Sequence, residues 1–225
     1  MGDGSITPRI GNMKALLGIV AGAGASYGIY KLISGGSFKR IKKSVTSESP
    51  VVRSSQPSEP QHLKMLLSCL QTSSNPSDRC RILLTLGNAA AFTVNQNLIR
   101  EFEGIHIIAG FLSDPAAEVR VQTLTALNNL CMNIPNQEHI KVYVPQVLEL
   151  IEMSPVNSDL QLGALRLLTN LSVTDKHQHL LKESITLLLS LLVVSNEVQA
   201  AKVLVNLSSN PDMMDDIVQA QVRLC

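Results

Sequence analysis

The 225-residue sequence contains no tryptophan, and aromatic residues make up only 3% of it. Hydrophobic residues still account for 45%, so any core must consist mainly of Leu, Ile, Val and Ala. Such a core suits helices packed on helices, and it disfavours a β-sandwich or barrel, whose strands are enriched in aromatic residues. We therefore expect an all-α protein, long enough for one large or two small domains.

The sequence is also poor in cysteine, with four residues and no CxxC pair. Cys69, Cys80, Cys131 and Cys225 have no paired spacing, and three of them lie among apolar residues at helical positions. A reduced cysteine in such a place behaves as a small hydrophobic residue. The pattern indicates a reducing compartment.

The chain lacks a strong net charge, at +1, because two regions of opposite sign compensate each other. Residues 1–60 carry eight Lys and Arg against three Asp and Glu, whereas residues 61–225 carry eleven against fifteen. An acidic body is a poor partner for phosphate backbones. We expect no nucleic-acid binding.

Residue patterns for catalysis or metal binding are missing as well. The two histidines of "KHQH", His177 and His179, would point to different faces of a helix, and no cysteine or carboxylate stands at metal-ligand spacing. His106 lies in an apolar segment, which predicts a hydrogen-bonded core residue. The glycines at 18–28 form no phosphate loop. We expect no enzyme activity, no cofactor and no metal site.

One segment, residues 13–33, is apolar enough to enter a membrane. Its sixteen residues from Ala15 to Tyr30 carry no charge, and as a helix they would span about 24 Å, short of a hydrocarbon core of about 30 Å. The segment is rich in Gly and Ala, which predicts a short and mildly hydrophobic anchor. The residues expected to contact lipid are Leu16, Leu17, Ile19, Val20, Tyr27, Ile29 and Tyr30.

A basic flank follows the apolar segment, while only Arg9 and Lys14 are basic before it. This asymmetry predicts that the carboxy-terminal body stays in the cytosol. A short anchor with a basic cytosolic flank is typical of signal-anchored proteins of the mitochondrial outer membrane, so we assign residues 1–43 to anchoring and targeting. The basic flank consists of Lys31, Lys39, Arg40, Lys42 and Lys43.

Other interpretations of this amino-terminal region remain open. A signal peptide cleaved near Ala25, or an anchor in the endoplasmic reticulum membrane, would also use an apolar segment. Asn170 and Asn206 are formal glycosylation sequons, although both lie in a helical pattern. Gly18 and Gly22 have the spacing that allows two anchors to pack closely as a homo-oligomer; the simpler interpretation is that these small residues only lower the hydrophobicity.

Residues 44–60, "SVTSESPVVRSSQPSEP", are dominated by Ser, Pro and Glu and have no apolar period. This composition predicts a flexible linker. It would hold the following domain away from the lipid surface.

From residue 61 onward the sequence repeats itself. Asn88, Asn129, Asn170 and Asn206 follow one another at intervals of 41, 41 and 36 residues, and each has a leucine two positions earlier. A period of about 40 residues with helical punctuation is typical of an α-solenoid.

One repeat shows its parts clearly. "NQNLIREFEG" predicts a short helix that ends at Gly104, whose freedom at positive φ would permit a sharp turn. "IHIIAGFL" predicts a largely buried second helix, and "SDPAAEVRVQTLTALNNLCMN" a long third helix capped by Ser113 or Asp114 with Pro115. Short, medium and long helices resemble an armadillo repeat. We therefore predict an armadillo-type α-solenoid of about three to four repeats over residues 61–225.

The recurring asparagines would line one surface of the solenoid, since equivalent third helices lie side by side. An asparagine amide carries a carbonyl and an NH₂ group, which match the N–H and C=O of an extended backbone. We predict that Asn88, Asn129, Asn170 and Asn206 bind a partner peptide. The alternative is that each asparagine bonds to the neighbouring repeat and only fixes the stacking.

Three segments, "YGIYKL", "LLTLGNAAAFTVNQNLIREFEGI" and "ALRLLTNLSVTDKHQHLL", resemble the Armcx/GASP group of mitochondrially anchored armadillo proteins. The resemblance implies outer-membrane anchoring, an armadillo domain exposed to the cytosol, and a role in mitochondrial distribution and dynamics. It also implies the Miro GTPases and the TRAK kinesin adaptors as partners.

Two features depart from related patterns. Armadillo adaptors for nuclear import place Trp four residues before the ladder asparagine, where this chain has Leu84, Thr125, Arg166 and Lys202. The two cations would repel a basic cargo, which disfavours a soluble nuclear adaptor as the alternative function. The chain also ends inside what would be a further repeat. We therefore expect a truncated domain whose last repeat exposes an apolar flank behind Val203, Leu204 and Leu207 and can pair with a second copy.

Overall fold

The computed structural model describes residues 60–195 and 197–224, and every regular element in these ranges is a helix. The all-α prediction is confirmed for this part of the chain. The predicted anchor and basic flank (residues 1–43), and the predicted linker up to residue 59, lie outside the described residues. In chain order the elements are α3 (Pro60–Thr72), α4 (Pro76–Ala89), α5 (Thr93–Glu101), α6 (Gly104–Ala109), η1 (Gly110–Ser113), α7 (Ala117–Cys131), α8 (Ile134–Ile140), η2 (Lys141–Tyr143), α9 (Val144–Met153), α10 (Asp159–Leu171), α11 (Asp175–Gln178), η3 (His179–Ser184), α12 (Ile185–Ser195), α13 (Val198–Ser208) and α14 (Pro211–Leu224), where η marks a 3-10 helix.

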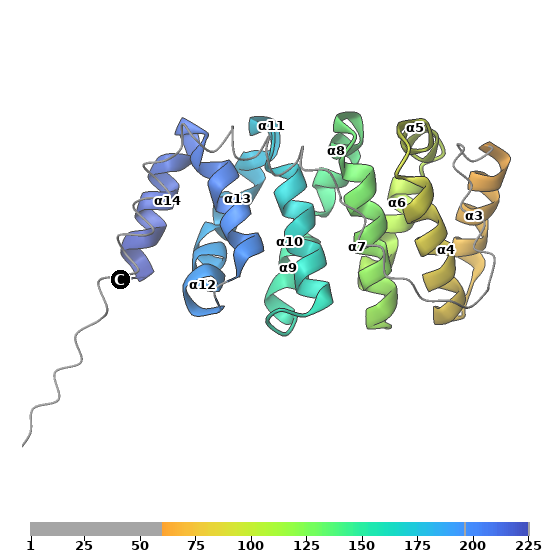
Figure 1. Cartoon of the computed structure of the whole chain (residues 1–225), viewed down its shortest axis with the longest axis horizontal. Helices are drawn as coiled ribbons and strands as arrows, with labels where there is room; N and C mark the ends of the chain where they lie inside the picture. The colour runs from red at the N-terminus through yellow and green to blue at the C-terminus, as the bar shows by residue number, and fades with distance from the viewer. Residues whose placement is uncertain (1–59, 196, 225) are drawn as a thin grey trace, which may run out of the picture.

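The helices form three similar units, flanked by the pair α3 and α4 at one end and by α14 at the other (Figure 1). Each unit has a short first helix (α5, α8 or α11), a middle segment (α6 with η1, η2 with α9, or η3 with α12) and a long third helix (α7, α10 or α13). The recurrence of a short helix, a middle segment and a third helix confirms the predicted three-helix repeat, although the third helix is clearly the longest element only in the first unit, where α7 has 15 residues. The units follow one another along one axis, so the domain is an open solenoid and not a closed globule.

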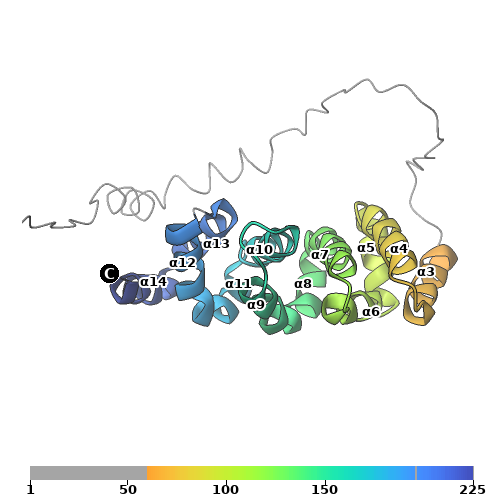
Figure 2. The ribbon, with the colours of Figure 1, turned by 90° about the horizontal axis from the view of Figure 1, so that it is seen from below.

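The third helices form one layer of the solenoid and the middle segments form the other. Figure 2 shows α4, α7, α10 and α13 along one face, with α6, α9 and α12 along the opposite face. Each third helix packs on the third helix of the next unit, and the middle segments pack behind them. The third helices therefore build a continuous surface, called here the third-helix face.

The core lies between the two layers and is made mainly of aliphatic side chains. The leucines two positions before the recurring asparagines are all buried: Leu86, Leu127, Leu168 and Leu204. Burying one leucine side chain contributes about 1.5–3 kcal/mol, so this repeated leucine stabilises every contact between units. The 41-residue period thus reports the recurrence of a core position.

The turn between α5 and α6 differs from its prediction. Glu103 adopts the left-handed conformation, with φ of 55°, and no described glycine has a positive φ. Gly104 is needed because of close packing: an added Cβ would lie 2.8 Å from Ile99 Cγ2, from the Ile99 carbonyl oxygen and from Leu67 Cδ1. The glycine therefore lets α6 approach the preceding helices, while Glu103 makes the turn.

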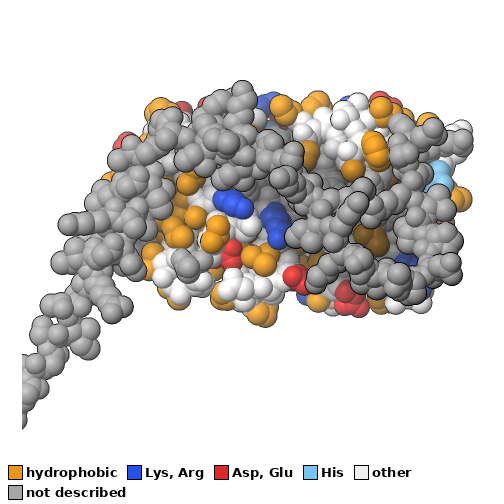
Figure 3. Space-filling view, viewed as in Figure 1, with side chains coloured by type: hydrophobic (Ala, Val, Ile, Leu, Met, Phe, Trp, Pro, Cys, Tyr) orange, Lys and Arg blue, Asp and Glu red, His pale blue; other side chains and the backbone are white. Residues whose placement is uncertain are grey.

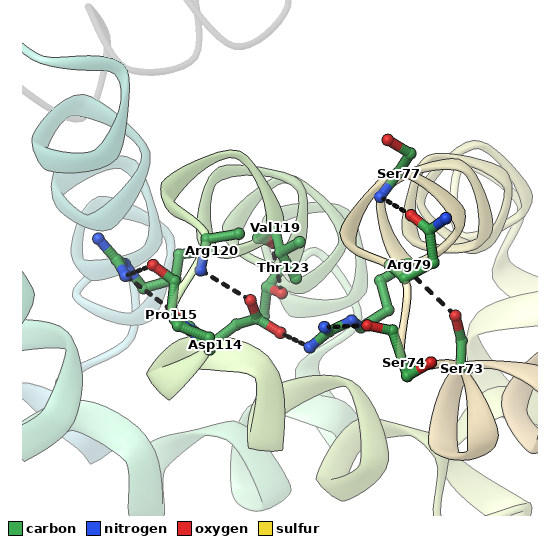
Figure 4. A network of polar contacts seen from close by, with 11 residues as sticks. Ser73, Ser74, Ser77, Arg79, Asp114, Pro115, Val119, Arg120 and Thr123 are labelled. Atoms are coloured by element: carbon green, nitrogen blue, oxygen red, sulfur yellow. Dashed lines mark hydrogen bonds and ion pairs between the residues drawn. The ribbon is translucent and has the colours of Figure 1, made fainter.

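The start of α7 also differs from its prediction. The residue before the helix is Ala116, which provides no side-chain cap, and Asp114 instead accepts a hydrogen bond from the Ala116 N–H at 2.9 Å. Figure 4 shows that the other Asp114 carboxylate oxygen pairs with Arg79 of α4, while the Asp114 carbonyl oxygen accepts from Arg120. The Asp114 side chain is buried and connects α4 with the start of α7, so this aspartate is not a simple helix cap.

The expected apolar flank at the last repeat is not exposed. Helix α14 packs against α12 and α13, and Val203, Leu204 and Leu207 are buried. Met213 and Ile217 of α14 are buried in this contact. The prediction of an uncovered flank on the last repeat is therefore wrong, because residues beyond Asn210 form a helix that covers it.

Residues Asp175–Ser195, which combine α11, η3 and α12, are by length and composition alone long and apolar enough to cross a membrane. Their side chains Ile185, Leu188 and Leu189 are buried inside the solenoid, where α12 packs on α13 and α14. A core helix of a folded domain can have the same length and composition, and we interpret this segment as a core helix.

Candidate partner-binding surface

The four recurring asparagines lie at equivalent places, near the carboxyl ends of α4, α7, α10 and α13 on the third-helix face. Asn88 is exposed, whereas Asn129, Asn170 and Asn206 are half-buried. Together they are called here the asparagine row. The half-buried state of Asn129, Asn170 and Asn206 means that these three side chains face both the neighbouring repeat and the solvent.

The side-chain nitrogens of the row bond to the preceding repeat in a constant register. Asn129 Nδ2 donates to the carbonyl oxygen of Gly87 at 2.8 Å, and Asn170 Nδ2 donates to the carbonyl oxygen of Asn128 at 3.5 Å and to its side-chain oxygen at 3.2 Å. Gly87 and Asn128 each stand one position before the preceding asparagine of the row. The row therefore helps to stack the repeats.

Asn206 follows the same register at the next unit. Its Nδ2 donates to the carbonyl oxygen of Thr169 at 3.2 Å, one position before Asn170, and to Ser172 Oγ at 3.0 Å. The amide nitrogens of Asn129, Asn170 and Asn206 are thus occupied by stacking, while within the described residues their side-chain oxygens accept no hydrogen bond. These oxygens remain available as acceptors for the N–H groups of a partner backbone.

A second polar repeat, not recognised in the sequence, reinforces the stacking from inside. Gln96, Gln137 and Gln178 are buried, and each stands eight residues after an asparagine of the row. Gln96 Nε2 donates to the carbonyl oxygen of Ala90 at 2.8 Å and to that of Asn129 at 3.0 Å, so it joins two successive units.

Gln137 and Gln178 make the corresponding pairs of bonds to the two carbonyl oxygens at their own unit boundaries. The 41-residue spacing of the dipeptides Asn95-Gln96, Asn136-Gln137 and His177-Gln178 would have revealed them in the sequence.

The positions four residues before the row form a second line on the third-helix face, and all four side chains are exposed. They change in character along the solenoid, from the apolar Leu84 and the hydroxyl of Thr125 to the cations of Arg166 and Lys202. Figure 3 views this face and shows Lys and Arg side chains close together near its middle. The surface beside the row is therefore apolar at one end and basic toward the other.

His106 is not the core residue that its apolar segment predicted, because its side chain is exposed and stands in a polar contact between two units. Its Nδ1 lies 2.8 Å from the hydroxyl of Tyr143, and its Nε2 lies 3.5 Å from Nδ1 of His139. The six-residue helix α6 is too short to bury every side chain of its apolar segment.

The two histidines of "KHQH" point to different faces, as predicted, with His177 buried and His179 exposed. Nε2 of His177 lies 3.5 Å from the carboxylate of Glu138, which also pairs with Lys141 at 2.7 Å and with Lys176. Hydrogen bonds from Lys141 and Lys176 lower the pKa of Glu138 to about 2. Burial lowers the pKa of His177, so this histidine is a neutral residue inside a charged contact between α8 and α11.

The described residues contain no group of three His, Cys, Asp or Glu side chains that could hold a metal ion. Burial raises the pKa of the Cys131 thiol to about 12, and burial together with Glu118 and Asp114 raises that of Cys80. Neither thiol is therefore activated as a nucleophile. The chemistry that the described surface offers is hydrogen bonding and charge pairing.

An open array of three-helix units whose third helices line one surface defines a class of protein-interaction scaffolds, typically without enzymatic activity. The chain belongs to the Armadillo-like family, whose family model matches residues 58–224.

Solved structures share the fold at low sequence identity. The designed armadillo repeat protein YIII(Dq.V1)4CPAF, solved in complex with peptide (KR)4, is 16% identical, with a TM-score of 0.65 over 97% of this chain and 85% of that one. The designed armadillo repeat protein YIII(Dq)4CqI is 16% identical, with a TM-score of 0.62 over 96% and 84%. An engineered protein, structural-genomics target OR329, is 18% identical, with a TM-score of 0.58 over 71% of this chain; the match spans 64% of that protein, less than two thirds of its length.

Proposed function

We propose that this protein is a membrane-anchored interaction scaffold of the mitochondrial outer membrane, with its armadillo domain in the cytosol. The apolar segment 13–33 would anchor it, the basic flank would direct it to mitochondria, and the linker 44–60 would give the domain reach. The domain would recruit proteins that control mitochondrial distribution and dynamics.

The binding part of this proposal depends on one observation: the side-chain nitrogens of the asparagine row bond to equivalent positions in the preceding repeat. Because the nitrogens of Asn129, Asn170 and Asn206 bond to the preceding repeat, the orientation of each amide is fixed. Their oxygens then stand at constant intervals along the third-helix face, where an extended segment could donate its backbone N–H groups. Asn88 is exposed at the end of the row and would add a further polar contact. Stacking and binding are in this view two uses of one side chain.

The partners proposed from the family resemblance are the Miro GTPases and the TRAK kinesin adaptors. One structural neighbour, the designed armadillo repeat protein YIII(Dq.V1)4CPAF, was solved in complex with peptide (KR)4. By analogy, the third-helix face of this chain would hold a segment of its partner. The basic residues Arg166 and Lys202 make a cationic segment of the (KR)4 type an unfavourable ligand here.

Localisation is tested by fusing residues 1–43 to a fluorescent protein and by expressing the full chain without residues 13–33. We expect the fusion to localise to mitochondria and to resist alkaline extraction. The deletion variant should be distributed diffusely in the cell. A reticular signal, cleavage near Ala25 or a glycan on Asn170 would place the protein in the endoplasmic reticulum. An unchanged location of the deletion variant would instead favour a soluble adaptor.

Partner capture is tested with the full-length tagged chain in cells, by probing for Miro and TRAK proteins after solubilisation of mitochondria. We expect Asn88→Ala, and the pair Asn129→Ala with Asn170→Ala, to weaken capture. Gln137→Ala is the matched control, because this residue bridges two units from inside but exposes no group on the third-helix face.

The comparison between these variants separates binding from stacking. If Gln137→Ala loses capture as strongly as the double asparagine variant, and Asn88→Ala keeps it, then the row serves stacking alone. If neither Miro nor TRAK is retained by the parent chain, the proposed partners are wrong.

A further inference from the structure

Arg166 and Lys202 occupy the same position in successive repeats, four residues before Asn170 and Asn206. Their helices α10 and α13 pack directly on each other. Both side chains are exposed on the third-helix face. Two positive charges therefore stand side by side next to the asparagine row.

These two cations are the exception among the basic side chains that the structure describes. Within residues 60–195 and 197–222, the other Lys and Arg side chains each contact a carboxylate, an amide or carbonyl oxygen, or an aromatic ring, while Arg166 and Lys202 contact none of these. The partnered residues are Lys64, Arg79, Arg81, Arg100, Arg120, Lys141, Lys176 and Lys182.

No acidic residue of the same helices lies close enough to compensate them. The carboxylates of α4, α7 and α10 are confined to the first turn, as Asp78, Glu118 and Asp159. Asp159 precedes Arg166 by seven residues, or about 10 Å along a helix. The carboxylate nearest the start of α13, Glu197, is buried and accepts from the Gln199 N–H at 2.8 Å.

On an exposed helix a long cationic side chain gains little by standing alone, and an acid three or four positions away is the usual local partner. Here that partner is missing at the same place twice, beside amide oxygens that still accept hydrogen bonds. Figure 3 shows basic side chains close together on this face, with mostly hydrophobic and uncharged side chains and a few acidic ones nearby. The surface is therefore complementary to a ligand that brings its own negative charge.

We infer that the α10–α13 half of the third-helix face binds an acidic, extended segment of a partner protein; this inference rests on the proposed function. Helices in contact lie about 8–10 Å apart, and alternate residues of an extended chain are about 7 Å apart. Two carboxylates two or three positions apart in the segment would reach Arg166 and Lys202. The backbone N–H groups of the segment would meet the oxygens of Asn170 and Asn206.

The test uses the full chain in nanodiscs of phosphatidylcholine and the fluorescence anisotropy of three short labelled peptides, in which Glu, Gln or Lys alternates with Ser. We expect the Glu peptide to bind most tightly and the Lys peptide most weakly. The affinity for the Glu peptide should fall as salt rises from about 50 mM to about 300 mM, because exposed charge pairs are screened.

The pair Arg166→Gln with Lys202→Gln should weaken binding of the Glu peptide by about tenfold, since two exposed ion pairs are lost. Arg166→Glu with Lys202→Glu should reverse the order of the Glu and Lys peptides. The matched control is Lys64→Gln with Arg81→Gln, which removes the same charge from exposed positions at the other end of the solenoid.

An equal affinity for the Glu and Gln peptides would overturn the inference. It would also be overturned if the control variant lost as much affinity for the Glu peptide as the variant of Arg166 and Lys202. Nanodiscs with one fifth phosphatidylserine test the competing ligand. If the acidic lipid abolishes binding of the Glu peptide, the basic pair faces the membrane and the inference is wrong.

Results that contradict this inference can be distinguished from results that contradict the proposed function. If Arg166→Gln with Lys202→Gln retains Miro or TRAK proteins while the asparagine variants lose them, the scaffold stands and the charge inference falls. A diffuse location of the full chain would contradict the mitochondrial proposal and would leave the peptide measurements unaffected.

Discussion

The side-chain nitrogen of Asn129 lies 2.8 Å from the carbonyl oxygen of Gly87, so an amide of one repeat is bonded to the backbone of the repeat before it. This contact fixes which end of the amide faces the neighbouring helix. The oxygen is then left on the side of the solvent. The recurring asparagine therefore helps to hold successive repeats in a constant register.

Replacement of Asn129 by alanine should lower the free energy of unfolding by about 1–2 kcal/mol, because a part-buried hydrogen bond between units is lost. Asn88→Ala should change it by less than about 0.5 kcal/mol, because the Asn88 side chain is exposed and bonds to no described residue. Urea denaturation of both variants checks the difference. Equal decreases in the free energy of unfolding of the two variants would mean that the hydrogen bond between Asn129 and Gly87 does not contribute to stability.

Alanine substitutions at two glycines of the same repeat should have opposite effects on stability. Gly104→Ala should destabilise the protein by about 1–3 kcal/mol, because its Cβ would meet the backbone and side chain of Ile99 at 2.8 Å. Gly110→Ala should stabilise it by about 0.4–1 kcal/mol, since an added Cβ meets nothing within 4 Å and its φ of −56° suits any residue.

The melting temperatures of the two variants should move in opposite directions. If both fell equally, a need for glycine flexibility, and not close packing, would explain Gly104.

The sequence predicted the larger features of this domain because they follow from periodicity. The 41-residue repeat of leucine and asparagine placed Leu127, Leu168, Asn129 and Asn170 correctly on third helices. Periodicity reports which face of a helix is buried, and that face is common to all repeats. It does not report what a single side chain meets across a boundary between repeats.

Local propensity failed where packing between distant residues decides the conformation. Gly104 was expected to take the positive φ of its turn, but Glu103 takes it because Gly104 is needed where Leu67 and Ile99 approach. His106 was expected in the core, and its partner Tyr143 comes from the next unit. Such contacts across a unit boundary have no signature in a short stretch of sequence.

Because Arg79 and Asp114 form a buried ion pair, Asp114→Ala should greatly lower the free energy of unfolding. Arg79 would keep its charge in a largely buried place without a carboxylate, which costs about 3–5 kcal/mol. The matched control is Asp78→Ala, whose contact with Arg81 at 3.9 Å is solvent-exposed and should be worth less than about 1 kcal/mol. Chemical denaturation distinguishes them, and comparable effects of the two substitutions would contradict a structural role for the buried pair.

The ion pairs of Glu138 predict that the stability of the folded state depends on pH in the acidic range. Its pKa is lowered to about 2 in the folded state by Lys141 and Lys176, below the value of about 4.3 expected in the unfolded chain. A lowered carboxyl pKa contributes stability above the unfolded value, and this contribution is lost as the pH falls from about 4.3 toward 2.

Glu138→Gln should therefore lose less stability than the parent chain between pH 5 and pH 2, as measured by thermal melts at a series of pH values. Glu149→Gln, at an exposed site of α9, serves as the control and should follow the parent. A parallel decline of the parent and Glu138→Gln would show that the two lysines do not stabilise the carboxylate.

His177 replaces, in the last complete unit, the asparagine that Asn95 and Asn136 provide in the two preceding units. Asn95 donates to the carbonyl oxygen of Ala89 at 2.9 Å and Asn136 to that of Leu130 at 3.1 Å, each six residues earlier. Nδ1 of His177 is buried and has no hydrogen-bond partner. His177→Asn should therefore restore this bond to the carbonyl of Leu171 and stabilise the protein by about 0.5–1.5 kcal/mol near pH 7.5.

The same substitution should also change the response to pH. Burial lowers the pKa of His177, with Lys141 and Lys176 acting in the same direction and Glu138 opposing them. The neutral histidine contributes stability above its unfolded pKa of about 6.5, and that contribution is lost as the pH falls below this value. The advantage of His177→Asn should therefore grow between about pH 7.5 and about pH 5.5, whereas the control His62→Asn, at an exposed position of α3, should not show this growth. An advantage that stays constant over this range would mean that His177 does not titrate differently in the folded and unfolded states.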